Sequence, residues 1–315
     1  MDHESKDISS STLVFGNELI FKNIVSSLVP TDMLQISVTC KLGWKYATLG
    51  LWTNPLLLYI DTFRGFVQGV EKKLPFKLAN NERYGDLVRS VNLSGLGGRW
   101  ERVGKQHIEQ IFKYCPQLQY LDINLCQHIS DDQIIGIFSR NPTTCQSLRY
   151  LDISETMFQD GTIATMLGYT KNLTTLNMNE TEVATQTVNT VITVLTELKS
   201  LEISDCFSID ADDINEIARS CKAITYLSFD EDLEDDASEA IELIKARGGT
   251  VRGDYDEMVG VMEGDDFQEY LEYQGHVDYD YEDFFGYDAF HSHNPLAQYE
   301  GYSDLDDDDE DDYEY

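Results

Sequence analysis

The sequence is poor in positive charge. It holds 23 Lys and Arg residues against 57 Asp and Glu residues, which gives a formal net charge of −34 at pH 7. A chain with this charge repels the phosphates of DNA and RNA. We therefore expect no nucleic acid among its partners.

Long hydrophobic runs are also missing. The most apolar stretch, Leu49 to Ile60, is interrupted by Thr53, Asn54 and Pro55, whereas a membrane-spanning helix needs about 20 apolar residues. The first residues are polar and acidic, unlike the start of a secretory signal. These absences lead us to expect no membrane partner and a cytoplasmic or nuclear location.

The sequence lacks the motifs of common catalytic and metal sites. The six Cys residues form no Cys-x-x-Cys pair, and we interpret them as reduced thiols. There is no Gly-x-Ser-x-Gly and no pair of His residues on a predicted helix. Adjacent carboxylates such as Asp212 and Asp213 lie side by side on a helix surface instead of facing across a cleft. We expect no catalytic residue, no metal, no cofactor and no enzymatic activity.

A short apolar motif, in contrast, returns six times. Its pattern is Leu-x-x-Leu-x-Leu, with Val, Ile, Met or Phe at some positions, and the copies begin at Val88, Leu118, Leu148, Leu173, Leu198 and Ile224. The starts are 25 to 30 residues apart, and recurrence of this motif at about that spacing is typical of a leucine-rich repeat. One copy cannot bury its own apolar face, so the copies must stack. The motif predicts an α/β leucine-rich-repeat solenoid over residues 88–252, with parallel strands on its concave face.

Amphipathic segments between the copies predict helices on the outside of the solenoid. They cover residues 129–139, 161–169, 183–195 and 209–220, and a last helix covers 235–245. Asp residues crowd their starts, where carboxylates cap free N–H groups and favour the helix dipole. Thr250 and Val251 can add one closing strand.

Alternation along each strand predicts a polar row on the concave sheet. Leu121 and Ile123 point to the interior, so Tyr120, Asp122 and Asn124 point outward. We assign target binding to eight residues of this row, because Tyr is frequent in binding hot spots: Tyr120, Asp122, Asn124, Tyr150, Asp152, Asn177, Glu202 and Tyr226. The row offers no Lys or Arg, so a neutral or basic target fits better than a phosphorylated one. A merely solvated sheet face is the alternative for any single residue.

The repeats resemble a known family in detail. The run from Tyr114 to Asp131 includes Cys115-Pro116 and Leu125-Cys126, and Cys206 and Cys221 repeat the two Cys positions. This pattern resembles the cysteine-containing repeat class common in F-box proteins. Thr156 and Thr181 stand where Cys126 and Cys206 do, which is a departure from the class.

Residues 13–60 predict a helical segment in which Pro30 ends one helix and Thr31 or Asp32 caps the next. The order of Glu18, Leu19, Ile24, Leu28, Pro30, Asp32, Leu34, Val38, Lys41 and Trp44 resembles an F-box. Phe15-Gly16 departs from the Leu-Pro that usually opens the motif. The resemblance implies that Leu19, Ile24, Leu28, Pro30 and Leu34 contact the Skp-type adaptor of a cullin ubiquitin ligase. A helical cap over the first repeat is the alternative.

The remaining segments have little periodicity. We interpret residues 1–12 as a disordered leader, 61–87 as a connecting segment and 253–315 as a disordered acidic tail. The tail contains 23 Asp or Glu residues, ten Tyr residues and no Lys or Arg, so self-repulsion should keep it open.

Taken with the resemblance, these features favour a substrate-recognition subunit of an SCF-type ubiquitin ligase, acting in the pathway of protein degradation. A non-enzymatic repeat scaffold or inhibitor of a signalling or cell-cycle protein is the alternative. An acidic chaperone-like protein for basic clients is a third hypothesis.

Overall fold

The computed structural model describes residues 18–76 and 82–252. All of them belong to one compact unit. The predictions for the leader and for the acidic tail lie outside the described residues.

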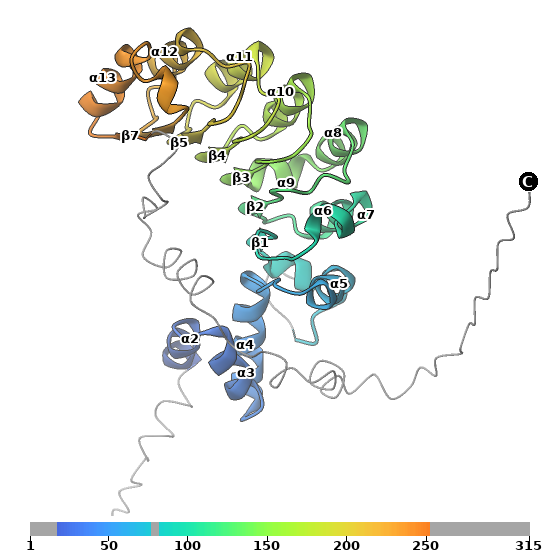
Figure 1. The fold of residues 1–315 in the computed structure, drawn as a ribbon. Helices are drawn as coiled ribbons and strands as arrows, with labels where there is room; N and C mark the ends of the chain where they lie inside the picture. The colour runs from blue at the N-terminus through green and yellow to red at the C-terminus, as the bar shows by residue number, and fades with distance from the viewer. Residues whose placement is uncertain (1–17, 77–81, 253–315) are drawn as a thin grey trace, which may run out of the picture. The chain divides into compact units, whose positions relative to one another are not determined.

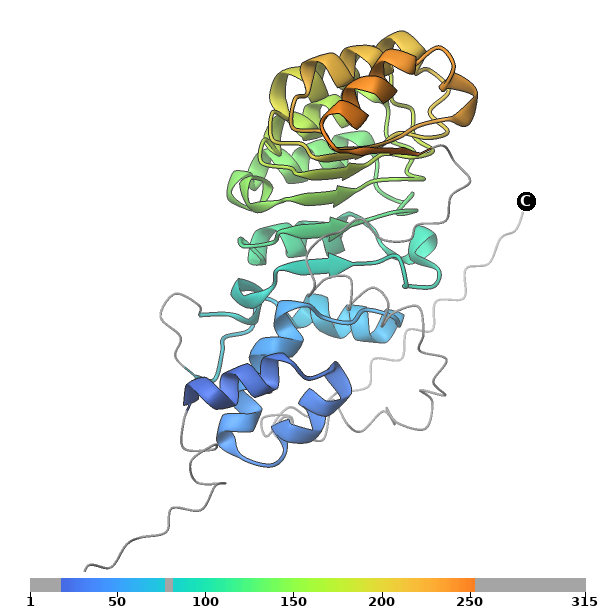
Figure 2. The same cartoon turned by 90° about the vertical axis from the view of Figure 1, so that its left-hand side faces the viewer.

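The six copies of the motif form strands of one parallel sheet, arranged in chain order (Figure 2). A seventh strand follows them, and the strands are β1 (Ser90–Asn92), β2 (Tyr120–Asp122), β3 (Tyr150–Asp152), β4 (Thr175–Asn177), β5 (Ser200–Glu202), β6 (Tyr226–Ser228) and β7 (Thr250–Arg252). The central residues of neighbouring strands align, as Leu121 does with Leu151. Those of β1 to β6 are fully buried. The inward and outward assignment made from the sequence is therefore confirmed.

After each of β1 to β6 the chain returns along one side of the sheet through helices, which gives a solenoid-like α/β fold (Figure 1). The returning helices are α7 (Lys105–Tyr114), α8 (Asp131–Arg140), α10 (Asp160–Tyr169), α11 (Thr185–Val194), α12 (Ala211–Ser220) and α13 (Ser238–Ala246). The two longer repeats also hold α6 (Arg99–Arg102) and α9 (Pro142–Ser147). Neither these two helices nor α7 was predicted from the sequence. A 3₁₀ helix, η2 (Glu231–Leu233), precedes α13.

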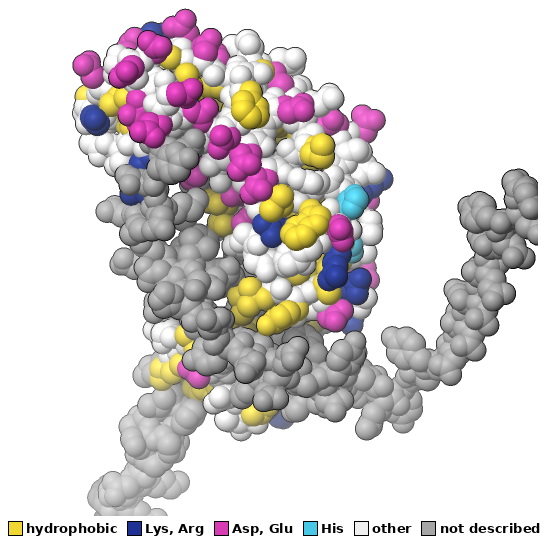
Figure 3. All heavy atoms as spheres, viewed as in Figure 1, with side chains coloured by type: hydrophobic (Ala, Val, Ile, Leu, Met, Phe, Trp, Pro, Cys, Tyr) yellow, Lys and Arg dark blue, Asp and Glu magenta, His cyan; other side chains and the backbone are white. Residues whose placement is uncertain are grey.

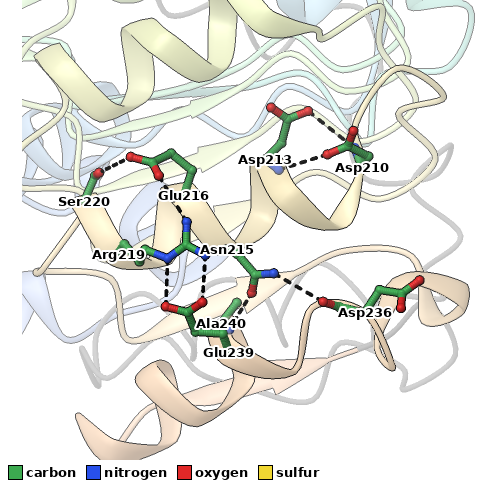
Figure 4. Close-up of polar contacts among 9 residues, drawn as sticks. All are labelled: Asp210, Asp213, Asn215, Glu216, Arg219, Ser220, Asp236, Glu239 and Ala240. Atoms are coloured by element: carbon green, nitrogen blue, oxygen red, sulfur yellow. Dashed lines mark hydrogen bonds and ion pairs between the residues drawn. The ribbon is translucent and has the colours of Figure 1, made fainter.

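Polar contacts fasten the last helix to its neighbour (Figure 4). Arg219 of α12 donates two hydrogen bonds of 2.7 Å to the carboxylate of Glu239. Asn215, which is buried, accepts from the Ala240 N–H at 2.8 Å and donates to the Asp236 carbonyl at 3.2 Å. These contacts hold α13 over the end of the core, and β7 completes the sheet behind it.

Before the sheet, the α-helices of the described residues 18–76 divide between two cores. The helices α2 (Glu18–Ser26), α3 (Pro30–Ser37) and α4 (Lys41–Thr53) share a small core of Phe21, Val25, Met33 and Ala47. In contrast, α5 (Ile60–Gly69) packs on the core of the sheet and its helices.

The helix α5 lies in the range that the sequence analysis interpreted as a connecting segment. Phe63, Phe66, Val67 and Val70 are all buried, and their spacing places them on one helical face. A 3₁₀ helix, η1 (Tyr84–Leu87), then leads into β1. The cap over the first repeat is therefore α5, with Leu57 beside it.

None of the described helices is long and apolar enough to cross a membrane. All six Cys residues are free thiols, and each except Cys40 is buried. Cys40 instead lies at the start of α4, where its Sγ accepts a hydrogen bond from the Gly43 N–H.

Candidate functional site

The candidate site is the open face of the sheet, which we define as the side chains at the first and third positions of the strands, opposite the helices (Figure 1). Register aligns them in two ladders. The first-position ladder is Ser90, Tyr120, Tyr150, Thr175, Ser200, Tyr226 and Thr250. The third-position ladder is Asn92, Asp122, Asp152, Asn177, Glu202, Ser228 and Arg252.

Two of the three predicted tyrosine anchors meet on this face. The rings of Tyr120 and Tyr150 stack with their centroids 3.9 Å apart and their planes at 14°. Tyr226 lies apart from them, because Thr175 and Ser200 intervene in the ladder. The face therefore has an aromatic pair near β2 and β3 and a single ring at β6.

The predicted acidic residues end their strands and hold the turns that follow. The Oδ1 atom of Asp122 accepts the Asn124 N–H at 3.0 Å, and that of Asp152 accepts the Ser154 N–H at 2.9 Å. Asn177 does the same for Asn179 at 3.0 Å. These side chains therefore have a structural part in each repeat, besides any contact with a target.

Half of the predicted target residues are buried, so they do not belong to a solvated face. Tyr120, Asp122, Asp152 and Asn177 are each at most 8% exposed. The second oxygen of Asp152 accepts from Asn177 Nδ2 at 3.0 Å and from the Tyr150 hydroxyl at 3.3 Å. Asn124, Tyr150, Glu202 and Tyr226 are half-buried, so these four are the ones that a partner can reach most directly.

Burial sets the electrostatics of the face. It raises the pKa of Asp122 to about 7, and the neighbouring Asp152 carboxylate adds to the rise. The pKa of Asp152 is raised as well, mainly by burial. Burial and the Asp152 charge together raise the pKa of Glu202 to about 7. The third-position ladder thus carries three carboxyl groups whose ionised form is disfavoured.

Arg99 is a residue of this region that the sequence analysis missed. It follows Gly97-Gly98, and Gly98 adopts φ 70° as the N-cap of α6. Arg99 Nε then donates to the Asn124 carbonyl at 2.9 Å, and Nη2 donates to Asn124 Oδ1. The only available signal was a lone Arg after a glycine pair, which is too weak to predict the contact.

The predicted adaptor-binding residues lie on α2 and α3. Ile24 is 40% exposed, whereas Leu28, Pro30 and Leu34 are half-buried. The side chain of Leu19 lies outside the described part. Three further apolar side chains of this region are exposed: Val29, Val38 and Trp44. The helices thus bring several apolar side chains to their surface around a small core.

Among residues 18–76 and 82–252, no group of three or more His, Cys, Asp or Glu side chains could hold a metal ion. No protein-family model matches the chain, and no curated protein sequence matches it.

Proposed function

We propose that this protein is the substrate-recognition subunit of an SCF-type cullin ubiquitin ligase, built from an F-box-like segment and cysteine-containing leucine-rich repeats. It has no catalysis of its own in this proposal. The chain holds a target close to the ubiquitin-charged enzyme, and proximity raises the effective concentration of the reacting groups. The cytoplasm or the nucleus is the place of action.

The surface of the three helices α2, α3 and α4 carries the proposal. Ile24, Val29, Val38 and Trp44 are 38–66% exposed, although their helices already share a core. Exposed apolar side chains gathered on one small unit favour a protein interface. Because α5 covers the end of the sheet core, these helices are not needed for that task alone.

The open face of the sheet is the proposed target site. Tyr150 and Tyr226 offer half-buried aromatic rings, and Glu202 stands between their strands in the third-position ladder. Such a surface suits a target segment that is neutral or basic, because an acidic segment would meet the carboxyl groups of the ladder.

Binding of a purified Skp-type adaptor tests the proposal. Wild-type chain should bind the adaptor, and the exposed double variant Ile24→Ser/Val38→Ser should weaken binding by about tenfold or more, because apolar contact area is lost. Lys22→Ser, an exposed change on the same helix, should bind as wild type does. Circular dichroism of each variant checks that it is folded. A wild-type chain that does not bind the adaptor contradicts the ligase proposal.

A repeat scaffold or inhibitor without a ligase is the second candidate. It is favoured by the way α4 joins the solenoid. The Trp52 ring lies 4.5 Å from that of Tyr84 and 5.8 Å from that of Phe66, and the Thr53 carbonyl accepts the Arg89 N–H at 2.8 Å. These contacts give α4 a structural use that needs no adaptor.

A further inference from the structure

The edge of the sheet where the strands end forms a second surface, separate from the open face. We call it the strand-end edge and define it by the loops that follow β3 to β6, which are residues 154–160, 179–184, 204–213 and 229–236. Figure 3 looks onto this edge and shows acidic side chains gathered over its upper part, with apolar side chains among them. The proposed function makes no use of it.

Two large apolar side chains on this edge are open to solvent. Phe207 is 100% exposed and Met157 is 71% exposed. Both occupy the same repeat position, one residue after the buried Thr156 or Cys206, and the other repeats place Gln127 and Glu182 there. Since polar residues occupy this position in those repeats, packing of the repeat does not require Phe or Met there.

A hollow of about 440 Å³ lies beside Phe207, between the loops that follow β3, β4 and β5. Ser208 and Thr181 line part of it, and Gln159 and Glu182 line another part. It is open to solvent and mixed in character, with an aromatic ring on one wall and a carboxylate on another. One side chain of a partner can enter it.

The charge around the apolar side chains has a single sign. The four loops contain fourteen Asp or Glu residues and no Lys or Arg. Helix capping accounts for some of them, as with Asp210, whose carboxylate accepts the Asp213 N–H at 3.0 Å.

Capping does not account for Glu155, Glu180 and Asp205. Each adopts a φ of 53–55°, a left-handed conformation that Gly, Asn and Asp adopt more readily than Glu does. Leu125 adopts the same conformation in the preceding repeat, with φ 58°, so the backbone does not require an acidic side chain at this position. Glu155 also accepts a hydrogen bond from Asn124 Nδ2 at 3.0 Å.

We propose that the strand-end edge binds a segment of a partner protein that carries a large apolar side chain flanked by Lys or Arg. Phe207 and Met157 supply the apolar contact, and the acids of the loops pair with the basic flanks. The chain's own residues 253–315 do not fit, because they contain no Lys or Arg. A second copy fits poorly for the same reason, since each copy carries a formal charge of −34.

Selection of random dodecapeptides displayed on phage against the full chain tests the proposal. Selected peptides should combine Leu, Met or Phe with Lys or Arg, and a synthetic copy of one should bind less tightly as salt rises from low to physiological concentration. The double variant Met157→Ser/Phe207→Ser should weaken its binding by about tenfold or more. Gln127→Ser, at the same repeat position, should have no effect.

Three outcomes overturn the proposal. The selected peptides lack basic residues, or they bind the double variant as tightly as wild type, or wild type self-associates and the double variant does not. Because the altered side chains are exposed, both variants should keep the melting temperature of wild type. Adaptor binding is measured on the same samples, so loss of the edge and failure of the ligase proposal are separate results.

Discussion

At the scale of single residues, the carboxyl groups of Asp122 and Asp152 repel each other. They align across neighbouring strands and are both buried. Burial and mutual repulsion raise the pKa of Asp122 to about 7 in the folded chain. Between pH 4 and pH 7 the unfolded chain therefore releases this proton before the folded chain does, and the contribution of Asp122 to stability falls as pH rises.

Asp122→Asn should remove this cost and keep the turn, since Asn92 and Asn177 accept the same N–H bond in their repeats. We expect the variant to be as stable as wild type near pH 4 and more stable above pH 7, by on the order of 2 kcal/mol. Thermal unfolding measured across this pH range checks the prediction. Asp235→Asn, which removes an exposed charge, is the control. If the stability difference between Asp122→Asn and wild type does not change with pH, the prediction is contradicted.

The sequence predicted the orientation of these residues but not their surroundings. Period-two alternation around Leu121 is enough to place Asp122 outward, because successive strand side chains point to opposite faces. It does not show that Asp152 also receives bonds from Asn177 and Tyr150. Those contacts depend on which strands align, so the sequence did not show that Asp122 and Asp152 are buried.

At the scale of elements, helix capping crosses from one repeat to the next. The first residue of α11 follows Ala184, which has no capping side chain. The carboxylate of Asp160, at the start of α10, accepts the N–H groups of Ala184, Gln186 and Thr187 at 2.9–3.0 Å. Partial burial acts to raise the pKa of Asp160, but these hydrogen bonds outweigh it and the pKa is lowered.

Asp160→Ala should destabilise the chain by about 1–2 kcal/mol, because three N–H groups at the start of α11 lose their acceptor. The lowered pKa means that this contribution is lost as pH falls through the folded-state value, the opposite direction to Asp122. Urea unfolding at neutral and acidic pH measures both effects. Asp132→Ala, in the first turn of α8, is the matched control. Equal losses in the two variants would show that Asp160 acts only on its own helix.

From the sequence, each such Asp was expected to serve its own helix. No helix was predicted in 61–87, in 105–114 or between 140 and 148. A cap donated across repeats depends on how two helices stack, which a one-dimensional pattern does not contain. In α5, the helical spacing of apolar residues is present in the sequence. It extends only from Phe63 to Val70, which is about two turns and too short to predict a helix with certainty of type. In contrast, α8, α10, α11 and α12 were predicted to within two residues at each end.

At the scale of the whole molecule, the two cores differ greatly in size. Among the side chains that the structure describes, four are buried in the core shared by α2, α3 and α4, whereas the other core extends from Leu57 to Ile244. A small apolar core makes local opening less costly than global unfolding. The proposed adaptor-binding unit should therefore be less protected from exchange than the strands of the sheet.

Hydrogen exchange measured by mass spectrometry checks this difference. Amides of α2 to α4 should exchange faster than those of β2 to β5, and a bound Skp-type adaptor should slow only the former. The buried strands serve as the internal reference, since their protection follows global stability. Equal protection of the two regions in the free chain would mean that the helices and the solenoid unfold as one unit.

The charges at the two ends of the strands have a consequence for diffusion. Arg89, Arg149 and Lys199 stand directly before strands, whereas Glu155, Glu180 and Asp205 follow them. Opposite charges at opposite edges give the solenoid an electric dipole along its strands. A positively charged protein approaching through solution is turned and drawn toward one edge before contact, which raises the frequency of productive encounters.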